Sequence, residues 1–214
     1  MVKQIPLKRS FIEQEIEAFA DDHNLDFDYG FMHWFYNLLF DLDYEELIPD
    51  DENVDGEGER QIDFIKIEID DVEKSAIVNI VQVKNAAGFS SNIVSLMKTG
   101  LDLMIKSKMS QINGLKNKKF AEKIKELRSV GSDYGYGNIH VNCFFVTLGD
   151  EEDISDEALE NRNIILFEYQ GEFFGSFEFN FIGVSELNRF INLRRSQRRY
   201  ISHDLPISYS ENRA

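Results

Sequence analysis

The sequence contains little of what disulfide bonds, chain breaks or membrane spans require. It has one cysteine, Cys143, and only three prolines among 214 residues. Because a single cysteine cannot form an internal disulfide, the fold must rest on a hydrophobic core, and a reducing cytoplasm is the expected location. No stretch reaches the roughly 18 uncharged apolar residues of a membrane span, and the opening residues MVKQIPLKRS lack the apolar core of a signal peptide. These absences predict an unsecreted protein with no membrane-spanning segment.

The composition is that of an ordered globular chain. Hydrophobic residues make up 43% of the sequence, with 18 Phe and 8 Tyr, which excludes disordered and low-complexity classes. A chain of this length fits one domain. We therefore expect residues 1–214 to form a single domain, with N-terminal helices in 1–45 and a sheet with its flanking helices in 60–195.

Charge is distributed unevenly along the chain. The net charge is −16, which by itself argues against nucleic-acid binding because it repels phosphates. Residues 21–73, however, hold 19 acidic side chains against Arg60 and Lys66, so the remainder is nearly neutral. Basic residues gather in 98–128 and 189–199. We expect an acidic, cation-attracting end and basic flanks that can meet a phosphate backbone, with ordinary solvated helix faces as the alternative.

The periodicity of apolar residues predicts the elements. Ser10 and Glu13 form a capping box that predicts a helix start, and this helix should end near residue 21. The apolar spacing predicts further helices over 28–40, 91–108, 116–128, 153–161 and 184–193, and strands over 61–70, 76–84, 139–148 and 163–170. The aromatic segment 171–183 is expected to be core, with some rings exposed to a partner. His33 and Cys143 are expected to be buried residues, not a ligand and a nucleophile. The pattern predicts an α/β domain with helices on a mixed sheet.

Three polar residues interrupt the first two predicted strands. Asp63 lies early on one strand, and Gln82 and Lys84 lie two apart near the end of the next. Side chains two apart project to the same face, and an antiparallel pairing brings Asp63 opposite them. Carboxylate and amide oxygens can hold Mg²⁺ or Mn²⁺, and the lysine ammonium can orient a water. This set predicts metal-dependent attack on a phosphodiester. The alternative is that the three residues are ordinary polar side chains of the strands, without a function in catalysis.

The segment VDGEGERQIDFIKIEID followed by AIVNIVQVKNAAGFSSNIVSLMKTGLDLMI resembles the N-terminal nuclease-like region of the abortive phage infection (AIPR) proteins, of the PD-(D/E)xK restriction-endonuclease-like superfamily. The resemblance covers residues 31–105. It implies a restriction-endonuclease-like core of αβββαβ type, with Asp63 and Gln82 as metal ligands, Asp55 as a further ligand and Lys84 as the catalytic lysine. It also implies anti-phage defence, and a chain that is the N-terminal portion of a longer protein.

The sequence departs from this family at the helix before the hairpin. Relatives place a glutamate there, whereas residues 31–40 contain none, so Glu46 or a glutamate of 11–17 is the candidate substitute. The leading hypothesis is a divalent-metal-dependent nuclease that cuts DNA in preference to RNA. The alternative is a catalytically degenerate nuclease fold that binds nucleic acid or protein. A homodimer is a further expectation. The expected nucleic-acid contacts are Lys116, Lys118, Lys119, Arg194, Arg195 and Arg198.

Overall fold

The computed structural model describes residues 5–43, 45–58, 60–171 and 173–203. Its helices and strands follow the order α1 (Ile5–His23), α2 (Phe27–Leu39), β1 (Phe64–Asp70), β2 (Ser75–Lys84), α3 (Ser91–Lys106), α4 (Met109–Asn113), α5 (Lys118–Tyr134), β3 (Ile139–Thr147), α6 (Asp156–Tyr169), β4 (Ser176–Ile182) and α7 (Val184–His203). Short 3₁₀ turns precede β3 and α6. None of the described helices is long and apolar enough to cross a membrane.

The four strands form one mixed sheet in the order β1-β2-β3-β4. β1 and β2 are an antiparallel hairpin, as expected, and β2, β3 and β4 run parallel. The described residues between α2 and α3 form two strands instead of the three consecutive strands of the αβββαβ pattern, with an isolated antiparallel bridge between Asn53 and Phe64. The α/β class with a mixed sheet flanked by helices is confirmed.

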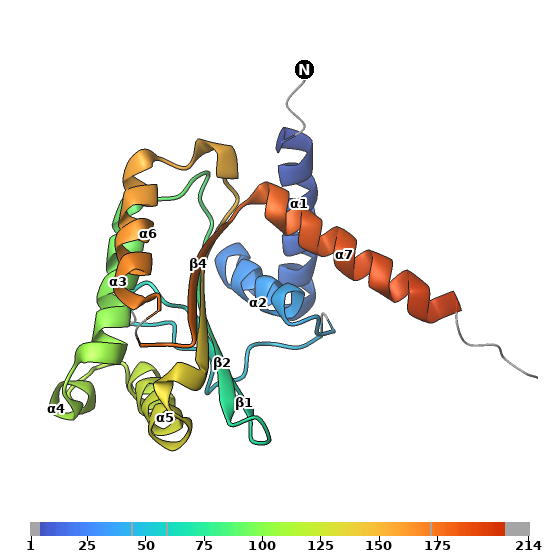
Figure 1. Cartoon of the computed structure of the whole chain (residues 1–214). Helices are drawn as coiled ribbons and strands as arrows, with labels where there is room; N and C mark the ends of the chain where they lie inside the picture. The colour runs from blue at the N-terminus through green and yellow to red at the C-terminus, as the bar shows by residue number, and fades with distance from the viewer. Residues whose placement is uncertain (1–4, 44, 59, 172, 204–214) are drawn as a thin grey trace, which may run out of the picture.

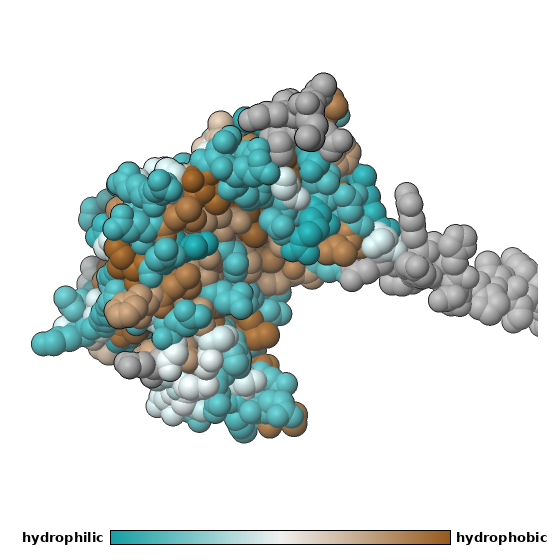
Figure 2. Space-filling model, turned by 45° about the horizontal axis from the view of Figure 1, so that its top comes forward, coloured by the Kyte–Doolittle hydropathy of each residue, from teal (hydrophilic) through white to brown (hydrophobic). Residues whose placement is uncertain are grey.

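Helices cover both faces of the sheet (Figure 1). α3, α5 and α6 pack on one face, around a core that contains Ile65, Ile80 and Phe145. α1, α2 and α7 pack on the other, around a core that contains Phe64, Val81 and Val146. β2 is therefore buried on both faces, which explains its nearly continuous apolar sequence. On the face shown in Figure 2, apolar residues gather between polar ones on the side away from α7.

Several predicted boundaries were wrong. Ser10 lies inside α1, which begins at Ile5, and Glu13 pairs with Arg9 at 2.9 Å instead of capping the helix. α5 continues to Tyr134, beyond the predicted helix end at residue 128, and α4 was not predicted. The predicted strand over 163–170 is the second half of α6, and the true fourth strand, β4, lies in the aromatic segment 171–183.

The two buried residues predicted to be structural are structural. Cys143 is fully buried in β3, and burial raises the pKa of its thiol far above the ordinary value. His33 is 6% exposed in α2, and its Nδ1 accepts a hydrogen bond of 2.9 Å from the backbone N–H of Ile48. Burial, with a smaller contribution from the charge of His23, lowers the pKa of His33 to about 4. A neutral imidazole is therefore part of the core.

Candidate functional site

Asp63, Gln82 and Lys84 come together where the hairpin pairing begins. Phe64 is paired with Val81, and the N–H of Asp63 extends the ladder with a bond of 2.8 Å to the carbonyl of Val81, so Asp63 lies opposite Gln82. Oδ2 of Asp63 accepts hydrogen bonds from Gln82 Nε2 at 2.9 Å and from the N–H of Val83 at 2.7 Å. The approach of Asp63 to Gln82 across the strands is therefore confirmed.

The amide of Gln82 has a fixed orientation. Its nitrogen donates to Asp63 and also to the carbonyl of Val83, at 2.8 Å. Since both partners are acceptors, exchanging the amide nitrogen and oxygen would set oxygen against oxygen. The remaining atom, Oε1, is buried and has no hydrogen-bond partner in the described part of the chain. A buried acceptor without a partner costs free energy, which a bound water or cation at that atom would recover.

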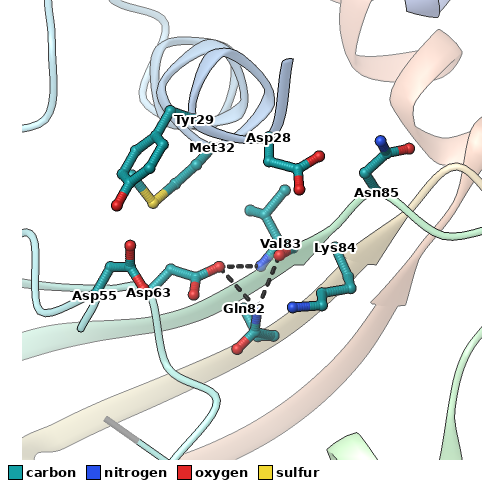
Figure 3. Close-up of a pocket in the computed structure, with 9 residues that line it drawn as sticks. All are labelled: Asp28, Tyr29, Met32, Asp55, Asp63, Gln82, Val83, Lys84 and Asn85. Carbon is teal, nitrogen blue, oxygen red and sulfur yellow. Dashed lines mark hydrogen bonds between the residues drawn. The ribbon is translucent and has the colours of Figure 1, made fainter. Parts of the chain in front are cut away.

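These residues line a cavity of about 210 Å³. Its wall is formed by Asp28, Tyr29, Met32, Asp55, Asp63, Gln82, Val83, Lys84 and Asn85. In Figure 3 the first three come from α2, and Lys84 extends alongside Gln82. Lys84 is exposed at the end of β2, whereas Asp63 and Gln82 are 8% and 2% exposed. The cavity therefore joins a buried polar pair to solvent.

Three residues of the cavity wall were not predicted as site residues: Asp28, Tyr29 and Asn85. Asp28 is in the first turn of α2, just before the segment 31–40 in which a helix carboxylate was sought. The proposed substitutes do not line the cavity: Glu46 is exposed near the C-terminal end of α2, and on α1 Glu13 and Glu15 pair with Arg9 and Arg195. The signal in the sequence was Asp26, the N-cap of α2, which places Asp28 and Tyr29 in the first turn of this helix. In Figure 3 both residues lie on the side of α2 that faces the hairpin.

The cavity has an acidic wall. Asp28, Asp55 and Asp63 face it, against the single ammonium of Lys84. The neighbouring Asp55 carboxylate, as an acceptor and as a negative charge, and partial burial raise the pKa of Tyr29. The phenol therefore stays protonated. An acidic cavity of this kind attracts cations and repels a phosphate until its charge is neutralised.

The donor types fit a hard divalent cation in part. Asp63 and Asp55 supply carboxylates, as expected, whereas the buried Gln82 Oε1 lacks a partner but lies on the side of the amide away from Asp63. Mg²⁺ commonly takes one or two carboxylates and keeps several waters. No group of three His, Cys, Asp or Glu side chains within the described ranges could hold a metal by itself, so a bound ion would need the amide oxygen and water.

The predicted nucleic-acid contacts are engaged with the protein itself. Lys116, two residues before α5, pairs with Glu57 at 2.7 Å, and Lys119 of α5 pairs with Asp50 at 3.3 Å, so both compensate the acidic loop 50–57. Lys118 donates to the carbonyls of Asn113 and Leu115. All three lysines remain exposed.

The arginine predictions have different outcomes. Arg194 is 5% exposed, and its guanidinium donates to the carbonyls of Asn37 and Leu42, so its prediction as a phosphate contact was wrong. It joins α7 to the C-terminal end of α2. Arg195 is exposed and pairs with Glu15 at 3.3 Å. Arg198 lies in α7, and its side chain is outside the described residues.

Comparisons with known proteins identify no relative of this chain. No protein-family model, no curated protein and no solved structure matches the chain. The resemblance of residues 31–105 to the AIPR nuclease-like region therefore stays a prediction.

Proposed function

We propose that the chain is a divalent-metal-dependent nuclease that hydrolyses phosphodiester bonds at the cavity between α2 and the β1–β2 hairpin. The observation that carries this proposal is the convergence of Asp63, Gln82 and Lys84 on one cavity. The resemblance adds the preference for DNA over RNA and the role in anti-phage defence. The homodimer stays a prediction.

Each residue has a chemical task in this proposal. Asp63, Asp55 and Gln82 Oε1 hold Mg²⁺ or Mn²⁺, and Asp28 adds negative charge that favours the ion. The ion would supply Lewis acidity toward a phosphoryl oxygen. Lys84, exposed beside Gln82, donates hydrogen bonds to the attacking water or to a phosphate oxygen and offsets the charge that develops there.

The Lys84→Ala variant tests this function directly. With MgCl₂ present, wild-type protein should cleave plasmid and single-stranded DNA, and Lys84→Ala should cleave at least about 100-fold more slowly, because a positioned proton donor typically contributes that much. Lys74→Ala removes an exposed lysine in the turn between β1 and β2 and is the matched control, with an unchanged rate. Equal cleavage by wild type and Lys84→Ala would end the assignment.

A second candidate is a nuclease fold that has lost catalysis and serves as a binding module. It is favoured by the Gln82 amide, which donates a hydrogen bond to Asp63 and so occupies the carboxylate that a metal needs. Isothermal titration with MgCl₂ separates the two candidates. A nuclease gives saturable heat that Asp55→Asn reduces, whereas the degenerate module gives none.

A further inference from the structure

Tyr29 presents an aromatic ring at the mouth of the cavity. The residue is 45% exposed and lines the same cavity as Asp63 and Lys84. In Figure 3 its ring stands on the side opposite Lys84 and Asn85, with Met32 beside it. A half-exposed tyrosine next to a polar cavity offers a flat face on which another ring can stack.

Two contacts fix the backbone that carries this ring. The backbone N–H of Tyr29 donates to the Asp26 side chain at 2.9 Å, which fixes the first turn of α2. The neighbouring Gly30 packs so closely on α1 that an added Cβ would lie 2.5 Å from Cβ of Ala20. The turn of α2 that carries the ring is therefore fixed in advance of binding, which lowers the entropy cost of stacking.

We propose that Tyr29 is a stacking platform for a nucleobase and that the cavity takes single-stranded nucleic acid, DNA or RNA, in preference to a duplex. This inference rests on the proposed nuclease function and names its substrate class. Stacking on an aromatic side chain is independent of base identity, because every base has a π-face. A base on Tyr29 would leave the adjacent phosphate directed at Asp63 and Lys84.

The charges around the cavity disfavour a second strand. Asp26 and Asp28 lie at the start of α2, and the loop 50–57 carries further carboxylates. Lys116 and Lys119, the basic residues next to that loop, are paired with it. A duplex has a higher phosphate density than a single strand, so it meets more repulsion from the acidic surroundings. Bases paired inside a duplex are also unavailable to Tyr29.

Fluorescence anisotropy with labelled oligonucleotides tests this inference. In the Lys84→Ala background with MgCl₂, the probes are a single-stranded DNA, the RNA of the same sequence, and the blunt DNA duplex. Single strands should bind about tenfold more tightly than the duplex, and adding Tyr29→Ala should weaken single-strand binding about tenfold. Tyr29→Phe keeps the ring and should stay within about twofold. Phe167→Ala, which removes a 92% exposed ring on α6, should change nothing.

The outcomes separate this inference from the function on which it rests. Duplex binding as tight as single-strand binding, or a folded Tyr29→Ala variant that binds single strands as before, overturns the stacking inference even if the wild type cleaves DNA. If no probe binds and the wild type does not cleave, the nuclease function and this inference both fall. The DNA and RNA arms report which sugar the cavity accepts.

Discussion

At the scale of single residues, Gln82 determines the charge state of the cavity. A carboxylate at this position would lie within hydrogen-bond distance of Asp63 in a site where both residues are almost fully buried. Two such charges repel each other unless a cation lies between them. The amide avoids this repulsion by donating to Asp63. The site is therefore stable without metal, with a weaker affinity for metal as the consequence.

Gln82→Glu should make folding depend on metal. In EDTA we expect the melting temperature to fall by roughly 5–10 °C, because an uncompensated buried charge is strongly destabilising. MgCl₂ should restore most of this loss, since an ion that binds the folded state stabilises it by mass action. The measurement is thermal unfolding in EDTA and in MgCl₂.

The matched control for this variant is Asn79→Asp. Asn79 is another buried amide of β2, 5% exposed and 3.2 Å from a Glu68 oxygen, and it does not line the cavity. The Asn79→Asp variant should also have a lower melting temperature in EDTA, but MgCl₂ should not restore it specifically. If both variants respond equally to MgCl₂, Asp63 and position 82 do not form a cation site.

At the scale of elements, the start of α7 depends on a side chain from a distant segment. Oε1 of Glu151 accepts hydrogen bonds from the N–H groups of Gly183 and Glu186 at 2.8 and 2.9 Å, and Oε2 accepts from Ser185 at 3.2 Å. These groups belong to the residue before α7 and to its first turn, where backbone N–H groups lack partners inside the helix. A carboxylate there also interacts favourably with the helix dipole.

Glu151→Ala should therefore lower the free energy of unfolding by about 1–2 kcal/mol. Urea denaturation followed by circular dichroism measures this change. Glu151→Gln keeps the acceptor but not the charge and should fall between wild type and alanine. Glu152→Ala, at the exposed neighbouring residue, is the control and should change stability little. An equal loss in both alanine variants would contradict the role of Glu151.

The misassigned strand over 163–170 illustrates what local sequence fails to decide. Its β-branched and aromatic residues favour a strand, yet Ala158, Ile165 and Tyr169 are buried at helical spacing on one side of α6. Ser155 caps this helix by accepting the N–H of Ala158 at 3.2 Å. The alternation in Ser176–Ile182, with Phe177, Phe179 and Phe181 facing the core, was the stronger strand signal.

At the scale of the whole molecule, ion pairs between distant segments reduce the charge asymmetry of the sequence. Beyond the pairs with the acidic loop, Lys98 bridges Asp102 and Glu168 at 2.8 and 2.7 Å, which joins α3 to α6. Burial alone would raise the pKa of Asp102, but hydrogen bonds from Lys106, Lys98 and Tyr169 lower it to about 2. The free energy of unfolding of the whole chain therefore depends on pH.

Stability should decrease in two steps as the solution is acidified. The unfolded state binds a proton at His33 near pH 6.5, whereas the folded state does so near pH 4, so stability falls between these values. Asp102 contributes stability above its unfolded pKa of about 3.9, and this contribution is lost as the pH falls through about 2. Thermal unfolding across pH 8 to 3 measures the first step.

His33→Asn is the variant that isolates the first step. Its amide oxygen can accept from the N–H of Ile48 as Nδ1 does, and it does not titrate. We expect a lower melting temperature at neutral pH and a flatter profile between pH 6.5 and 4. His140→Asn, at an exposed histidine of β3, should keep the wild-type profile. A wild-type slope in His33→Asn would show that another group controls this window.

The sequence by itself determined the hairpin, the central apolar strand β2, the burial of Cys143 and the approach of Asp63 to Gln82. These features depend on residue spacing along one or two adjacent strands, and side-chain alternation fixes them locally. Tertiary structure decided the rest. It turned Gln82 Nε2 toward Asp63, brought Asp28 and Tyr29 over the hairpin, and buried Arg194 under α2. The first depends on hydrogen bonds to Asp63 and Val83. The other two depend on how α2 and α7 pack on the sheet, and such contacts between distant segments leave no periodic signal in the chain.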